Sequence, residues 1–146
     1  MSAGRKRPTS GRIICATPRL GLQTQLQTLL LTVAGNKHVE SVRTLTDLQA
    51  ILATLPLRPR PLAAQPAFVL LDTELPDITD ALLLDIVGRT AATHRVVIVD
   101  ARQRFAFGAK LLALGAAGFI DPALPDDLLN QALRHHLLAA ASANRI

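Results

Sequence analysis

The sequence predicts an α/β fold in which one parallel sheet lies between two layers of helices. Short apolar runs, several of them rich in β-branched residues, alternate along the chain with segments whose apolar residues recur at helical spacing. Such alternation is typical of a parallel sheet with helices on both faces. The 146 residues suit one domain, and 49% of them are hydrophobic, so the chain can bury roughly two-thirds of its unfolded surface.

Five strands are predicted, and they differ in how buried they should be. RVVIV at residues 95–99 is an unbroken β-branched run, typical of a central parallel strand that is covered on both faces. HVESV at 38–42 is short and more polar, which favours a position at the edge of the sheet. The other predicted strands are residues 12–17, 67–71 and 118–120.

Each strand leads into a predicted helix. Thr17 and Pro18 are expected to open the first helix as N-cap and first helical residue, and Gly35 is expected to end it. Thr46 and Asp47 are expected to open the second. The remaining boundaries are Pro56 at the end of the second helix, a third helix at 78–87 closed by Gly88, a fourth at 103–114 ended by Gly115, and a fifth opened by Pro125, Asp126 and Asp127.

The chain divides into three predicted segments. Residues 1–11 form a basic, disordered tail, residues 12–140 the folded domain, and residues 141–146 a C-terminal tail. Within the domain, LRPRPLAAQP at 57–66 is a proline-rich loop that is longer than most connections between a helix and a strand. Two interpretations of this loop are equally supported: a stiff segment presented to a partner, and a tolerated spacer.

The net charge of +5 comes partly from the N-terminal residues Arg5, Lys6, Arg7 and Arg12. Basic tails can bind nucleic acid or anionic surfaces, but a solvated leader is the favoured interpretation. The four aromatic residues, all Phe, are few for a protein that stacks on bases. No apolar run is long enough to span a membrane and no signal peptide is recognisable, so we expect a cytoplasmic protein without membrane contact.

The order of the predicted elements favours a five-stranded, doubly wound sheet of flavodoxin-like order, in three layers. Sites in such sheets lie beyond the carboxyl ends of the strands, which places three carboxylates at one edge: Asp72, Asp100 and Asp121. For Asp100 and Asp121 we favour a turn or cap role, in which the side chain accepts backbone N–H groups. A divalent-metal site built from all three aspartates is an alternative.

Three segments resemble the receiver domains of two-component response regulators. VLLDTELPD at 69–77 resembles the segment that carries the phosphoacceptor aspartate, which would here be Asp72. KLLALGAAGFI at 110–120 is similar to the segment before and within the fifth strand, and PDDLLNQAL at 125–133 to the start of the last helix. The resemblance covers residues 12 to 140 and implies a role in signal transduction or transcriptional regulation.

The other functional positions of that family are not matched. The acidic pair that holds Mg²⁺ after the first strand and the lysine after the fifth strand are both missing, and Asp100 replaces the hydroxyl residue after the fourth. We therefore expect neither Mg²⁺ nor another cofactor. The residues that stand at these positions, and that are predicted to line the rim of the pocket, are Cys15, Ala16, Thr17, Asp100, Asp121 and Pro122.

A phosphoryl group brings roughly two negative charges, and these would meet carboxylates that no cation balances. The sequence therefore predicts a degenerate receiver, or pseudo-receiver, in which Asp72 is phosphorylated poorly or not at all. The alternative is a phosphoacceptor in which Asp100 helps to rebuild the metal site.

Enzyme motifs are absent: the chain has no glycine-rich phosphate loop and no Gly-x-Ser-x-Gly. A buried structural role is favoured for Cys15, the single cysteine, and surface or rim positions for His135 and His136. We expect a protein partner, or a second copy in a homodimer, to bind the face formed by residues 103–137. The residues predicted to take part in this interface are Arg102, Arg104, Lys110, Phe119 and Leu124.

A DNA-associated regulator is the rival interpretation. The chain would then be a fragment of a longer regulator, or it would contact DNA through its basic tail. Binding through the tail should collapse between low and physiological ionic strength, whereas a protein interface with an apolar centre should not. We favour a stand-alone receiver-like protein that acts by protein–protein contact.

Overall fold

The computed structural model describes residues 12–33, 39–55 and 67–143, in which strands and helices alternate from end to end. The strands form one parallel sheet in the order β2-β1-β3-β4-β5. The predicted doubly wound, five-stranded fold is therefore confirmed. The strands are β1 (Ile13–Ala16), β2 (Glu40–Val42), β3 (Phe68–Asp72), β4 (Arg95–Val99) and β5 (Gly118–Ile120).

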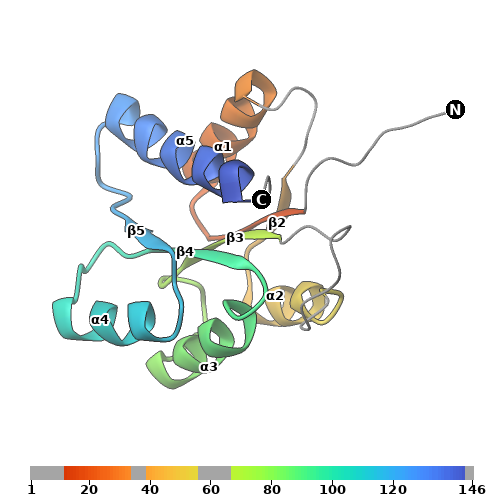
Figure 1. Ribbon diagram of the computed structural model, residues 1–146, viewed down its shortest axis with the longest axis vertical. Helices are drawn as coiled ribbons and strands as arrows, with labels where there is room; N and C mark the ends of the chain where they lie inside the picture. The colour runs from red at the N-terminus through yellow and green to blue at the C-terminus, as the bar shows by residue number, and fades with distance from the viewer. Residues whose placement is uncertain (1–11, 34–38, 56–66, 144–146) are drawn as a thin grey trace, which may run out of the picture.

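The helices cover both faces of the sheet. Figure 1 shows α1 and α5 on one face and α2, α3 and α4 on the other. Their bounds are α1 (Leu20–Val33), α2 (Leu45–Leu52), α3 (Asp80–Thr90), α4 (Phe105–Ala113) and α5 (Asp126–Ala143). No helix among the described residues is both long and apolar enough to cross a membrane.

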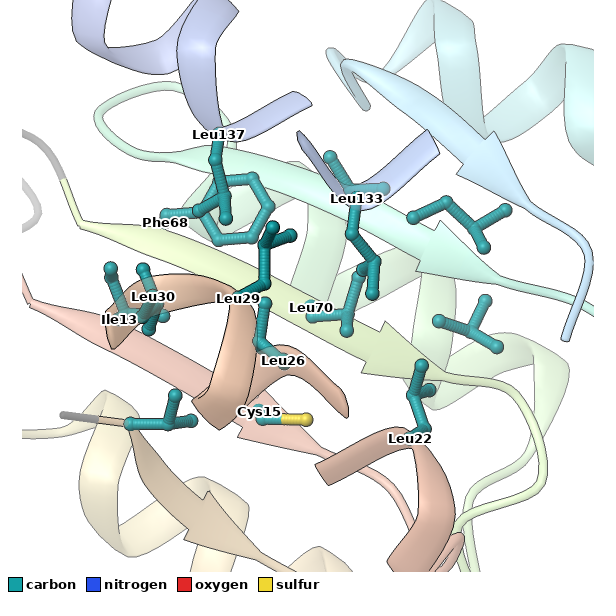
Figure 2. Packing of buried hydrophobic residues seen from close by; sticks show 14 of the residues in the cluster. Ile13, Cys15, Leu22, Leu26, Leu29, Leu30, Phe68, Leu70, Leu133 and Leu137 are labelled. Carbon is teal, nitrogen blue, oxygen red and sulfur yellow. The ribbon is translucent and has the colours of Figure 1, made fainter. Parts of the chain in front are cut away.

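Two apolar cores lie on the two faces of the sheet, because successive side chains of a strand point to opposite sides. In β4, Val97 and Val99 join the core under α1 and α5, while Val96 and Ile98 join the core on the opposite face. The first core is seen closely in Figure 2, where side chains of β1 and β3 face leucines of α1 and α5. The strand at 95–99 has neighbours on both sides and both faces covered, as predicted, and β2 is an edge strand.

Several helix boundaries differ from the prediction. Helix α1 begins at Leu20, and the Thr17 hydroxyl accepts the Arg19 N–H at 3.0 Å, in the turn that precedes the helix. Gly88 lies inside α3, which continues to Thr90. A glycine inside a helix costs about 1 kcal/mol relative to alanine, so it is a weak stop signal when the packing of its neighbours favours helix.

The ends of α2 and α5 also differ. Thr44, and not Thr46, is the N-cap of α2: its side chain accepts the Asp47 N–H at 3.1 Å. Helix α5 extends to Ala143, three residues past the predicted end of the domain at 140. The predicted tail at 1–11, the stop signals at Gly35 and Pro56, and the proline-rich loop at 57–66 lie outside the described residues.

Arg12 belongs to the folded domain and not to the basic tail. Its guanidinium makes two hydrogen bonds to the Glu40 carboxylate, at 2.7 and 2.6 Å, and a third to the Thr54 hydroxyl at 2.7 Å. These contacts join the residue before β1 to the edge strand β2 and to the end of α2. Arg12 therefore helps to attach the edge strand β2 and the end of α2 to the start of β1.

Candidate functional site

Three aspartates stand at the carboxyl edge of the sheet. Asp72 is the last residue of β3, where it lies opposite Val99 of β4, and Val99 in turn lies opposite Ile120 of β5. Asp100 and Asp121 follow these two strands directly, so the parallel register brings all three carboxylates to one edge. Asp72 is fully buried, Asp100 is nearly so, and Asp121 is half-buried.

Both oxygens of the Asp72 carboxylate are engaged. Its Oδ2 accepts the Thr17 hydroxyl at 2.6 Å and the Nε–H of Arg19 at 2.8 Å. Its Oδ1 accepts the backbone N–H of Glu74 at 2.8 Å. Asp72 is therefore a buried carboxylate that pairs with a partly exposed guanidinium through one oxygen and makes a turn contact through the other.

Arg19 was not singled out from the sequence, and it changes the electrostatics of the pocket. The predicted pocket had no cation to balance its carboxylates, whereas the guanidinium of Arg19 pairs directly with Asp72. Its side chain is 35% exposed, so it closes the pocket from the solvent side. Arg19 stands three residues after β1, and every residue just beyond a strand end lies at the same edge. Considering basic as well as acidic residues in the segment after β1 would have identified Arg19 as a candidate.

Thr17 ties this arrangement together. Its hydroxyl donates to Asp72 and accepts the backbone N–H of Arg19, so one group links both members of the ion pair. Its own backbone N–H donates to the carbonyl of Val42 on the edge strand β2, at 3.1 Å. The position of the hydroxyl is thus fixed from two sides.

Asp100 and Asp121 serve as turn residues. Asp100 Oδ1 accepts the N–H of Arg102 at 3.0 Å and the hydroxyl of Thr73 at 3.3 Å. Asp121 Oδ1 accepts the N–H of Ala123 at 2.9 Å, and its Oδ2 accepts a side-chain N–H of Gln103 at 2.8 Å. Bonds to the N–H two residues ahead are typical of Asx turns. Neither carboxylate pairs with a cation in the described part of the chain.

The three aspartates do not form a metal centre. Within residues 12–33, 39–55 and 67–143, no three His, Cys, Asp or Glu side chains are grouped so that they could hold a metal ion. A hard divalent cation needs several free oxygen ligands. Three of the roughly four lone-pair positions of Asp72 are taken by Thr17, Arg19 and Glu74, and the residues after β1 supply no carboxylate. The residues at this edge therefore do not fit Mg²⁺.

Two of the residues predicted for the rim are core residues instead. Cys15 and Ala16 are fully buried and point to opposite faces of the sheet, because they are consecutive in β1. Figure 2 shows Cys15 among the leucines of α1. Burial, and then the nearby charge of Asp72, raise the pKa of the Cys15 thiol to about 12, so it is not a nucleophile at neutral pH. Pro122 lines a separate groove between α1 and α5.

The basic residues predicted for the partner interface differ in their exposure and in the ion pairs that they form. Arg104 donates from Nη1 to Asp80 at 2.8 Å and stacks over the Phe107 ring at 4.3 Å, so it joins α4 to α3. Arg102 is half exposed, and its closest acidic contact, to Glu74, is a loose 3.9 Å. Lys110 is exposed on α4.

The apolar residues of the predicted interface support the fold. Leu124 is half-buried and packs against the core under α1 and α5. Phe119 is also half-buried, and its ring lies against Gly108 of α4, where an added methyl would stand 3.4 Å from Cζ. Beside Phe119, α4 and β5 border a groove of about 430 Å³ that Phe105 and Leu112 help to line.

Comparison with solved structures shows that the fold is similar to that of receiver domains. No family model and no curated protein matches the chain. The response regulator domain of Thermotoga maritima CheB is 17% identical and superposes with a TM-score of 0.65, over 94% of this chain and 98% of that one. A signal receiver domain from Bacteroides fragilis is 24% identical with a TM-score of 0.63, over 90% and 97%. The beryllofluoride-activated NtrC4 receiver domain dimer is 15% identical with a TM-score of 0.63, over 88% and 98%. The receiver fold implied by the sequence motifs is confirmed.

Proposed function

We propose that this receiver-fold protein is a cytoplasmic signalling protein that acts by protein–protein contact and without phosphorylation of Asp72. One observation carries the proposal: the carboxylate at the phosphoacceptor position is fully buried, and both of its oxygens are hydrogen-bonded, one of them to Arg19. In this chain the pocket is held closed by its own side chains.

Phosphoryl transfer to a carboxylate makes demands that this pocket meets poorly. An oxygen of Asp72 must present a lone pair to phosphorus in line with the departing group, so that the new O–P bond forms as the old one breaks. Attack by Oδ2 would require its bonds to the Thr17 hydroxyl and the Arg19 guanidinium to break first, and Oδ1 already accepts the Glu74 N–H. A cation must also balance the charge of the incoming group. The cation nearest to Asp72 is Arg19, and it is already paired with the carboxylate that would have to attack.

A contact function is supported by the surface of α4 and the loop before it. Arg102 and Lys110 supply exposed positive charge, and Phe105 and Leu112 supply exposed apolar area. Large exposed apolar side chains that lie together mark interaction sites more often than isolated ones do. One of the similar structures is a receiver domain dimer by its own description. A regulatory protein or a second copy is the partner class that we propose for this face.

The proposal is tested by the mass of the intact protein after incubation with Mg²⁺ and acetyl phosphate. Wild type, Asp72→Asn and Arg19→Ala are compared, with a competent receiver domain treated alongside. We expect the competent domain alone to gain a phosphoryl group. A gain by wild type that Asp72→Asn abolishes would show a phosphorylated switch and overturn the proposal. A gain by Arg19→Ala alone would show that Arg19 is the whole block, and that the missing acidic pair matters little.

A further inference from the structure

Two buried polar atoms at the amino edge of the sheet, opposite the aspartates, have no hydrogen-bond partner among the described residues. They are Nε of Arg95, the first residue of β4, and Nδ1 of His136 on α5. The other such atoms belong to Arg104, whose charge is already paired with Asp80. An unsatisfied buried polar group costs about 1–3 kcal/mol, and in a native fold it marks strain, a catalytic role, or a bound water or ion.

The register of the strands brings these two side chains together. The His136 ring lies over Gly118, the first residue of β5, where an added methyl would stand 2.5 Å from Cε1. Gly118 lies opposite Val97 of β4, and Arg95 comes two residues before Val97, about 7 Å along the strand. Because alternate residues share a face, Arg95 points with Val97 to the side that α1 and α5 cover. Arg95 and His136 are therefore neighbours on that side (Figure 1).

The surroundings of this pair are positively charged. No carboxylate in the described segments forms an ion pair with Arg95, or with Arg134, which is exposed two residues before His136. Burial lowers the pKa of His136, and the nearby His135 and Arg95 lower it further, so the positive charges here oppose one another. A partly buried group of cations without a carboxylate creates a positive potential that attracts anions.

We propose that Arg95 and His136 bind an oxyanion, a phosphate or carboxylate group, at the amino edge of the sheet. The Nε–H of Arg95 and its adjacent Nη–H form a planar fork that matches two oxygens of one anion. Nδ1 of His136 donates a further hydrogen bond when the ring carries a proton there. One anion satisfies both buried atoms and balances the charge of Arg95. It also favours the imidazolium form of His136, so uptake of the anion is linked to uptake of a proton.

NMR of the His136 ring in the full chain tests the site. Sodium sulfate is the probe for a phosphate group, because sulfate does not titrate near neutral pH, and sodium acetate is the probe for a carboxylate. At an ionic strength held constant with sodium chloride, sulfate should shift the Cε1–H signal of His136 saturably. The affinity should rise as the pH falls through the range in which histidine titrates, because the imidazolium form then becomes more populated.

Two arginine variants separate a built site from a general attraction of anions. Arg95→Gln should weaken sulfate binding at least about tenfold, because hydrogen bonds to charged groups are the stronger ones. Arg134→Gln is the matched control: it removes the same charge from the exposed surface of α5, close to His136 in the sequence. It should change the affinity by less than about twofold, because exposed charges are screened by salt.

Gly118→Ala tests the geometry, because the added methyl must displace the His136 ring while both binding groups remain. Sulfate binding should be lost; if circular dichroism shows that this variant does not fold, Arg95→Gln decides alone. A shift that sodium chloride reproduces, or equal losses in the two arginine variants, would show ordinary screening and overturn the inference. So would full binding by Arg95→Gln or by a folded Gly118→Ala. Saturation by sulfate alone supports a phosphate site, and saturation by acetate as well extends it to carboxylates. The site lies at the edge opposite Asp72, so its failure would leave the proposed function untouched.

Discussion

Replacing Asp72 with asparagine should destabilise the protein. The two side chains have nearly the same shape, but asparagine has one acceptor oxygen where aspartate has two. Three donors converge on the carboxylate: the Glu74 N–H on Oδ1, and the Thr17 hydroxyl and Arg19 Nε–H on Oδ2. Whichever way the amide is turned, its NH₂ group faces an N–H donor, of Glu74 or of Arg19.

The size of the effect follows from the same contacts. A hydrogen bond to a charged group is worth about 1.5–3 kcal/mol, and breaking a buried ion pair costs about 3–5 kcal/mol. Water can reach the Arg19 side chain, which is 35% exposed, and this hydration offsets part of the loss. We therefore expect Asp72→Asn to lower the free energy of unfolding by about 2–4 kcal/mol.

Urea unfolding at neutral pH, followed by circular dichroism, measures this change. Asp100→Asn is the matched control. Asp100 is nearly as buried, its two hydrogen bonds both fall on Oδ1, which asparagine keeps, and no cation of the described segments pairs with it. Its stability should change little or rise. If Asp72→Asn instead stabilised the protein, repulsion between the carboxylates would dominate the pocket. The ion pair with Arg19 would then make no net contribution to the free energy of unfolding.

Two further predictions concern titratable groups that the fold covers in part (His136) or fully (Cys15). Burial lowers the pKa of His136, and the neighbouring His135 and Arg95 lower it further, so the unfolded chain takes up the proton at higher pH than the folded one. The contribution of neutral His136 to the free energy of unfolding should therefore be fully present above about pH 6.5 and decrease as the pH drops below this value. His136→Gln should remove this part of the pH dependence of urea unfolding. The thiol of Cys15, with its pKa raised to about 12, should react with iodoacetamide at pH 8 only when urea unfolds the protein. Rapid labelling of the folded protein would contradict its placement in the core.

The fold could be predicted because its signals are local. The run at 95–99 is apolar without interruption because β4 is covered on both faces, and the predicted bounds of that strand match the structure. The polar Glu40 and Ser41 marked β2 as an edge strand for the converse reason. Helix ends were predicted less well, because Gly88 is tolerated inside α3.

The site could be predicted only in part. The positions of Asp72, Asp100 and Asp121 follow from where the strands end, but their partners do not. The pairing of Arg19 with Asp72 joins residues 53 apart in the sequence, through a side chain long enough to reach in several directions. In FAFGAKLLA of α4, Leu111 is buried whereas Phe105 and Leu112 are exposed. Whether Phe105 is covered depends on neighbouring elements, which periodicity along one helix does not reveal.

The hydrogen bond from the Thr17 N–H to the Val42 carbonyl links the closed pocket to the edge of the sheet. Strand β2 has three residues and pairs only with β1, so it belongs to the part of the fold that hydrogen exchange would find opening at low free energy. When β2 separates, Thr17 loses its backbone anchor, and its hydroxyl is then positioned only by its own bonds to Asp72 and Arg19. An opening that costs about 3 kcal/mol would be populated in fewer than about one molecule in a hundred. Loosening of the pocket from this side would then be a rare fluctuation of the sheet edge, opposed by the hydrogen bonds that Arg12 makes to Glu40 and Thr54.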